Sequence, residues 1–150
     1  MEDKFSIINK TRSKIPTLSF IPVKNDILGK NYSLSLAYIT KEEIKKINKT
    51  YRNKNKPTNI LSFSLSKTSG EILLCPSLIK NQTDKFGRNF AQLLGFLVIH
   101  GMLHLKGMQH SSTMETLENK YDQKYFCRNR HGVHDDKSRC GRISKRRKKS

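Results

Sequence analysis

Residues 86 to 110 read FGRNFAQLLGFLVIHGMLHLKGMQH, and this stretch decides how the rest of the chain must be arranged. Apolar residues cover nearly every side of the segment from Phe86 to Lys106, which predicts one long helix buried in the core. Gly107 then suits a helix that ends in a left-handed turn, because glycine lacks the Cβ atom that disfavours this conformation. We therefore expect a domain built around a buried helix.

Three histidines stand at the end of this helix, at positions 100, 104 and 110. His100 and His104 are four residues apart, so both imidazoles lie on one helix face and can reach the same ion. A left-handed turn at Gly107 would bring His110 back toward this pair. Three imidazoles leave one position of a metal open for water, which is the arrangement of hydrolytic zinc sites. The alternative is a polar cluster with a structural role only.

The spacing of the histidines is that of zinc proteases with the pattern H-E-x-x-H-x-x-G-x-x-H. Those enzymes carry a glutamate general base directly after the first ligand, where this chain has Gly101. The missing carboxylate argues against a peptidase, and the net charge of +18 also suits a polyanion better than a peptide. Nucleic acid is favoured over a membrane, because no apolar run has spanning length and no basic stretch doubles as a strongly amphipathic helix.

Other segments show the periodicity of short strands and helices. Thr40 and Glu43 have the spacing of a capping box and predict the start of a helix that stops before Pro57. The remaining expected helices cover 20–28 and 113–125. The expected strands cover 5–9, 32–39, 59–65 and 71–75, the last one after a turn at Ser69–Gly70.

The last part of the chain differs in composition from the rest. Residues 128–150 contain ten Lys or Arg against two Asp and almost no apolar residues. We expect one domain over 1–127 and a basic, disordered tail over 128–150. The tail is either a nonspecific tether for RNA, favoured here, or a solvated segment without a specific role. A second zinc site formed by Cys127 at the domain boundary with His131, His134 and Cys140 of the tail is the less favoured interpretation, because their spacing fits no zinc finger.

Two features bear on the cellular compartment. The chain has three cysteines, and an odd number of them indicates reduced thiols rather than a disulfide framework. The first residues, MEDKF, lack the charged and then apolar pattern of a secretion signal. We expect a cytoplasmic protein without a membrane partner.

Residues 51–56, YRNKNK, offer positive charge at the end of the first basic helix. Cleavage of a phosphodiester requires groups that stabilise the developing negative charge. Arg52 is a better candidate than Lys54 or Lys56, because a guanidinium can bind two phosphate oxygens at once. From the residues alone, a solvated helix end that favours the helix dipole explains this run equally well.

Three motifs resemble those of the YbeY-type endoribonucleases, a family of metal-dependent rRNA maturation factors of bacteria. HGMLHLKGMQH at 100–110 is similar to the family's H-G-x-L-H-L-x-G-Y-D-H. YR at 51–52 with KPTNILSF at 56–63 resembles its Y-R…K-P-T-[DN]-V-L-S-F, and METLE at 114–118 resembles its M-x-x-L-E. The family usually has Tyr-Asp where this chain has Met108-Gln109, which removes a carboxylate beside the third histidine.

The resemblance implies an α+β fold, a small mixed β-sheet packed with helices, with zinc at the base of a cleft. It implies that His100, His104 and His110 hold one Zn²⁺ and that Arg52 is the catalytic cation beside the scissile phosphate. The implied activity is single-strand-specific cleavage of RNA in 16S rRNA 3′-end maturation and ribosome quality control. The implied partners are single-stranded RNA, rRNA and ribosome or small-subunit components.

Two questions stay open at the level of the sequence. The attacking group is either water or the ribose 2′-hydroxyl. The alternative function is that of a non-catalytic, ribosome-associated RNA-binding protein with a structural zinc.

Overall fold

The computed structural model describes residues 4–126, and residues 1–3 and 127–150 lie outside the described part. The predictions for the basic tail concern those outer residues: its disorder, its role as an RNA tether and the second zinc site weighed for Cys127, His131, His134 and Cys140. They stay predictions, as does the domain boundary at residue 127.

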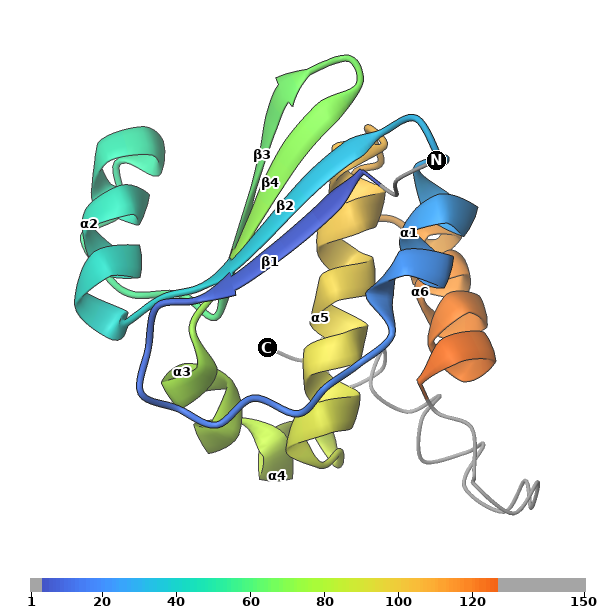
Figure 1. Ribbon diagram of the computed structural model, residues 1–150. Coiled ribbons are helices and arrows are strands. Elements are labelled where there is room, and N and C mark those ends of the chain that lie inside the picture. The colour runs from blue at the N-terminus through green and yellow to red at the C-terminus, as the bar shows by residue number, and fades with distance from the viewer. Residues whose placement is uncertain (1–3, 127–150) are drawn as a thin grey trace.

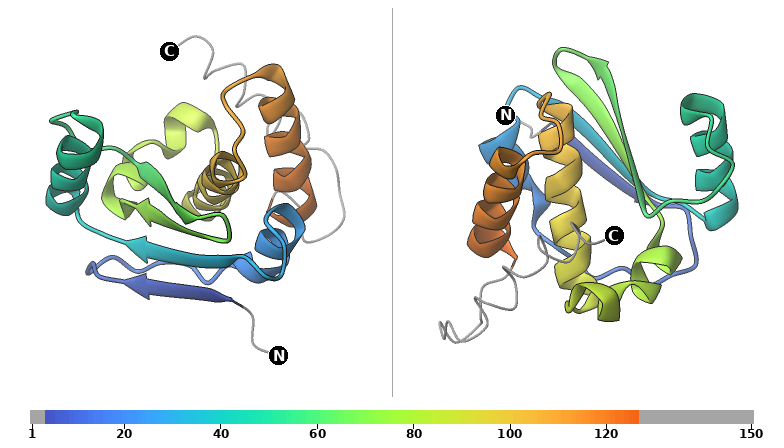
Figure 2. Two further views of the ribbon diagram at one scale, coloured as in Figure 1. Left: turned by 90° about the horizontal axis from the view of Figure 1, so that it is seen from above. Right: turned by 180° about the vertical axis from the view of Figure 1, so that it is seen from behind.

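The described residues form one β-sheet with helices on both faces (Figure 1), which is the α+β architecture that the motifs implied. Helices α1, α5 and α6 cover one face and α2 lies on the other (Figure 1). Seen from behind, α5 lies between the sheet and α6 (Figure 2). The elements are β1 Phe5–Asn9, α1 Phe20–Ile27, β2 Ser33–Tyr38, α2 Lys41–Arg52, β3 Ile60–Ser66, β4 Ser69–Leu74, α3 Pro76–Asn81, α4 Thr83–Phe86, α5 Phe90–Leu105 and α6 Ser112–Tyr125.

The sheet has the strand order β1-β2-β4-β3 and is mixed. β1, β2 and β4 are parallel, whereas β3 forms an antiparallel hairpin with β4 and lies at the edge. Side chains alternate between the two faces. Leu36 and Ile72 belong to the larger core around α5, while Leu61 and Leu73 join Ile44 of α2 in a smaller one. Ile60 of the edge strand β3 packs against the larger core, so this strand borders both cores.

The central helix α5 begins at Phe90, so the predicted start at Phe86 was wrong. Gly87 adopts a left-handed conformation with φ 64° and ends the short helix α4, which contains Phe86. Asn89 then caps α5 through reciprocal hydrogen bonds with Gln92. The apolar pattern continues across this break, because Phe86 also packs against the core.

The predicted turn at Ser69–Gly70 was also wrong, because both residues belong to β4. Gly70 serves close packing instead of a turn. A Cβ atom at this position would lie 2.4 Å from the hydroxyl oxygen of Tyr32 and 2.9 Å from Cδ2 of Leu105. The glycine thus lets the end of α5 approach the sheet.

A buried ion pair joins α6 to the segment before α5. Arg88 pairs with Asp122, and each side chain is only 1% exposed. The Arg88 guanidinium also lies 4.6 Å from the centroid of the Phe96 ring, on α5. A buried charge that loses its partner is strongly unfavourable, so this pair constrains how α6 lies on α5.

We predict that Asp122→Ala destabilises the domain by about 3–5 kcal/mol, because it leaves the buried Arg88 charge without its carboxylate. The double variant Arg88→Met/Asp122→Leu replaces both charges with apolar groups of similar size and should recover most of this loss. Urea denaturation followed by circular dichroism measures both. A double variant no more stable than Asp122→Ala would show that packing, and not the uncompensated charge, causes the loss.

Candidate metal site and substrate cleft

The last turns of α5 bring two of the three histidines together, as their spacing predicts. The ring centroids of His100 and His104 are 4.5 Å apart. Gly107 adopts the expected left-handed conformation, with φ 102°, and the turn that follows returns His110 toward the pair. The His110 ring centroid lies 5.1 Å from that of His100 and 4.7 Å from that of His104. The sequence thus located this cluster correctly.

The cluster has the geometry of a group that could hold a metal ion. Each imidazole offers one nitrogen, and these three atoms lie within 4.8 Å of one another. The Nε2 atoms of His100 and His104 are 3.0 Å apart. Three imidazole nitrogens suit zinc and other borderline divalent metals.

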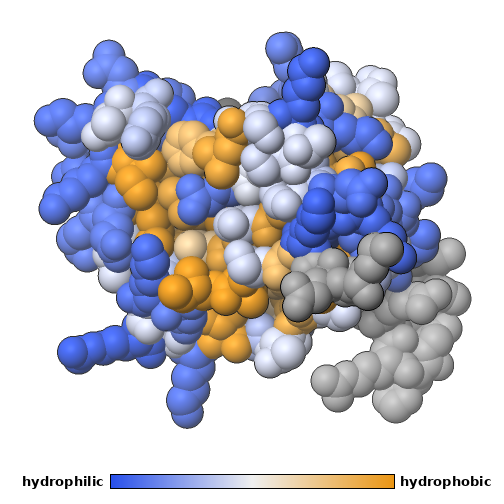
Figure 3. Space-filling model, turned by 45° about the horizontal axis from the view of Figure 1, so that its top comes forward, coloured by the Kyte–Doolittle hydropathy of each residue, from blue (hydrophilic) through white to orange (hydrophobic). Residues whose placement is uncertain are grey.

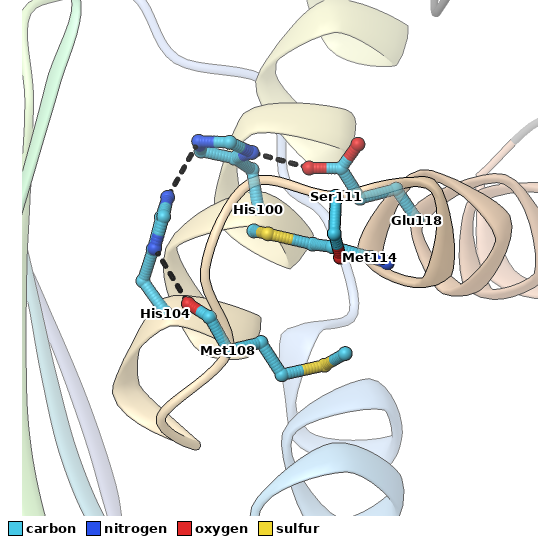
Figure 4. Close-up of polar contacts among 6 residues, drawn as sticks. All are labelled: His100, His104, Met108, Ser111, Met114 and Glu118. Carbon is cyan, nitrogen blue, oxygen red and sulfur yellow. Dashed lines mark hydrogen bonds and ion pairs between the residues drawn. The ribbon is translucent and has the colours of Figure 1, made fainter.

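Hydrogen bonds at the Nδ1 atoms of His100 and His104 orient the two rings so that their Nε2 atoms point toward each other. Nδ1 of His100 bonds to the carboxylate of Glu118, and Nδ1 of His104 lies 3.1 Å from the carbonyl oxygen of Met108 (Figure 4). Both acceptors favour the tautomer with the proton on Nδ1, which leaves lone pairs on both Nε2 atoms. Two converging lone pairs repel each other, and a cation bound between them removes this repulsion. The donor set therefore fits a metal.

Glu118 is a residue of the site to which the sequence analysis gave no role. Its side chain is completely buried, and it reaches His100 from α6 (Figure 4). Glu118 belongs to the METLE motif, which assigned it no role, and the helix that carries it was predicted from its apolar residues alone. Met114, Glu118 and Asp122 follow one another at intervals of four residues and are all buried, so one helix face carries them. Two carboxylates on a core-facing stripe were the available signal.

The Met108-Gln109 departure leaves the contacts of His100 and His104 intact. His104 uses the backbone carbonyl of Met108, which any residue at that position supplies. His100 takes its carboxylate partner from Glu118 and not from the turn. The carboxylate that Gln109 lacks is therefore not required for either contact.

Gly101 lies against the sheet. A Cβ atom there would be 3.0 Å from Cδ1 of Ile72 and 3.2 Å from Cδ1 of Ile60. A side chain at this position, such as the glutamate of the zinc proteases, would require both isoleucine side chains to shift by a few tenths of an ångström. The close contact between α5 and the hairpin thus favours a small residue at position 101.

Burial and the neighbouring rings of His100 and His110 lower the pKa of His104. A lowered pKa favours the neutral form of the His104 imidazole. A neutral imidazole is the form that binds metals.

Arg52 lines the same cleft as the three histidines. This cleft has a volume of about 520 Å³, and Lys54 and Lys56 also line it. Nη2 of Arg52 donates a hydrogen bond to the carbonyl oxygen of Ser62, at 3.2 Å. Arg52 is the last residue of α2, so this bond fixes the helix end beside the edge strand β3.

The segment after Arg52 is held by a buried asparagine. Asn53 adopts a left-handed conformation, φ 58°, and ends α2. Nδ2 of Asn48, which is buried within α2, donates a hydrogen bond to the carbonyl oxygen of Lys56, at 2.9 Å. The start of α2 is as predicted, since Thr40 and Glu43 form the capping box. The cationic segment from Arg52 to Lys56 is thus held at Arg52 by the Ser62 carbonyl and at Lys56 by Asn48.

Within residues 4–126, no helix is long and apolar enough to cross a membrane.

Comparison with known proteins agrees with the motifs. The family model described as "Endoribonuclease YbeY" matches residues 4–128. An endoribonuclease YbeY of Staphylococcus carnosus is 32% identical over 117 residues, covering 70% of this chain and 76% of the relative. That of Staphylococcus saprophyticus is 33% identical over 126 residues, covering 76% and 78%.

A solved structure shows the same fold. The solution structure of TM1509 from Thermotoga maritima superposes with a TM-score of 0.56 and 25% sequence identity. The match covers 80% of this chain and 87% of that protein. The family model and the curated relatives together show that this chain belongs to the YbeY endoribonuclease family.

Proposed function

We propose that this chain is a zinc-dependent endoribonuclease that cleaves single-stranded RNA. We place this activity in the cytoplasm, where its substrate is ribosomal RNA at the 3′ end of 16S rRNA. A further proposed role is ribosome quality control, with small-subunit components as partners. One observation carries the proposal: three converging imidazoles and a guanidinium line one cleft. The names of the relatives support it, because each is an endoribonuclease.

His100, His104 and His110 would hold the metal, and the other groups have separate tasks. When bound, zinc would act as a Lewis acid that lowers the pKa of the attacking oxygen. Glu118 keeps the His100 ring oriented and its tautomer fixed. Arg52 would bind the phosphate and stabilise its developing charge, since the Ser62 carbonyl engages only part of its guanidinium.

Two routes of attack are compatible with these roles, and the products distinguish them. A 2′,3′-cyclic phosphate end would identify the ribose 2′-hydroxyl as the attacking group and exclude direct attack by water. A linear phosphate end that appears without a cyclic intermediate would identify water.

The competing function is a non-catalytic RNA-binding protein with a structural zinc. We predict that His110→Ala lowers bound zinc well below the roughly one equivalent expected for a three-His site, and abolishes cleavage. His110 is exposed, so folding and RNA binding should be largely retained. Elemental analysis, gel-based cleavage and fluorescence anisotropy measure the three properties.

His131→Ala is the matched control for this variant, because it removes a histidine from the basic tail. It should keep both zinc and activity. Cleavage that persists in His110→Ala would show that the active site is assigned wrongly. Zinc binding without any cleavage by the wild type would favour the structural alternative.

The buried carboxylate at position 118 gives a prediction for metal affinity. Glu118→Gln keeps the size of the side chain but removes the charge that orients His100, so zinc affinity should fall by about 10- to 100-fold. Competition with a chromogenic chelator measures this change. Glu115→Gln is the matched control on α6 and should leave the affinity unchanged. Equal affinities for all three proteins would remove Glu118 from the site.

For Arg52, the prediction concerns the chemical step. Arg52→Ala should lower the cleavage rate at saturating RNA by on the order of 100-fold or more, because a group that stabilises transition-state charge is lost. Arg52→Lys should retain an intermediate rate, since lysine supplies charge without bidentate geometry. Lys54→Ala, the control in the same cleft, should change mainly RNA affinity. A normal zinc content in each variant would separate this role from metal binding.

A further inference from the structure

Tyr51 is a large aromatic side chain that the fold leaves in solvent. Its side chain is 71% exposed, although it lies next to the proposed phosphate-binding Arg52. Its ring packs edge-on against Phe63 of β3, with a centroid separation of 5.5 Å and an interplanar angle of 63°. Phe63 itself packs on the smaller core, so it supports one side of the Tyr51 ring while the rest of the ring stays accessible.

Arg52 connects this aromatic pair with the metal cleft. Its guanidinium lies 5.9 Å from the centroid of the Phe63 ring, and the same side chain lines the cleft of the three histidines. A nucleotide with its phosphate on Arg52 therefore has the Tyr51–Phe63 pair within reach of its base or of its neighbour's base.

The charge around Tyr51 suits a polyanion. Lys49 lies in the last turn of α2, and Lys54 and Lys56 follow it. The acidic residues of α2, Glu42 and Glu43, lie in its first turn, at the other end. Glu71 of β4 is paired with Phe63, and the four cationic residues of positions 49–56 outnumber this one carboxylate. Figure 3 shows one face of the molecule, with hydrophilic side chains over α2, at the left, next to patches of hydrophobic residues. An exposed ring in a cationic surrounding is the combination that binds single-stranded nucleic acid, because every base has a π-face for stacking.

We propose that Tyr51, supported by Phe63, forms a stacking subsite for an unpaired base of the RNA, next to the phosphate on Arg52. This inference rests on the proposed function and supplies a physical reason for a preference for single strands. A base inside a duplex is already stacked on both sides and cannot offer its face to Tyr51.

The test measures how a substitution at Tyr51 and the removal of one RNA base affect binding, separately and together. Binding of a labelled single-stranded RNA to the full chain is measured by fluorescence anisotropy with a chelator present, so that the RNA stays intact. A series of oligonucleotides each lacks one base at a different position. For the wild type, one abasic position should weaken binding by roughly 10-fold, the order expected for the loss of one stacked base.

In Tyr51→Ala, binding of the intact strand should weaken by a similar factor, and that abasic position should no longer matter. Tyr51→Phe should behave like the wild type, whereas Tyr51→Leu, which is apolar but not aromatic, should resemble Tyr51→Ala. Leu65→Ala is the matched surface control, because Leu65 is also exposed, 64%, on β3. It should leave binding and the abasic profile unchanged.

Two results would overturn the subsite: an abasic profile that is identical in the wild type and Tyr51→Ala, or an equal loss of affinity for duplex and single-stranded RNA. Cleavage with zinc is measured in parallel. Cleavage that depends on His110 but shows no coupling at Tyr51 would refute the subsite alone. Coupling at Tyr51 without cleavage would refute the catalytic proposal and leave the subsite standing.

Discussion

The close contact between the end of α5 and the β3–β4 hairpin is the constraint on which the rest of the site depends. A Cβ atom at Gly70 would lie 2.9 Å from Cδ2 of Leu105 on α5, and one at Gly101 would lie 3.0 Å from Cδ1 of Ile72 on β4, so both glycines allow this close contact. The helix can therefore lie against the edge of the sheet at the turn that carries His100 and His104. The same edge strand receives Arg52 through the Ser62 carbonyl, so one packing contact brings the metal ligands and the cation into a common cleft.

The interface between α5 and α6 adds a second constraint, which is electrostatic. Glu118 and Asp122 are fully buried on one stripe of α6, and their partners His100 and Arg88 belong to the other side of the interface. Burying such groups is unfavourable unless each finds a partner with good geometry. The packing of α6 is therefore defined by position-specific pairs, and apolar contacts alone would tolerate small shifts of the helix. A ligand ring held by Glu118 gains its fixed orientation from this arrangement.

The local parts of the structure could be predicted from the sequence, and the contacts between distant residues could not. The apolar pattern located α5, the capping box of Thr40 located α2, and the offsets of the histidines with Gly107 located the cluster. Short elements such as α3 and α4 carry too few residues to show a period, and Phe86 continues an apolar pattern across a helix break. Gly70 looked like a turn residue because its packing partners, Tyr32 and Leu105, are remote in the sequence. Only the fold brings Glu118 to His100 and places Arg52 in the histidine cleft, so Arg52 was predicted from the family resemblance and Glu118 was missed.

The hydrogen bond from His104 to the Met108 carbonyl has a consequence for how the turn can vary. The contact is made by the main chain, and the left-handed Gly107 before it fixes the path of that main chain. The side chains of Met108 and Gln109 are therefore not needed to orient His104. Met108 packs its side chain against the core, so its size still matters for packing, while the exposed Gln109 is the position of the turn that can vary most freely. A Met-Gln pair in place of Tyr-Asp therefore keeps the hydrogen bond that orients His104, because the peptide unit supplies it.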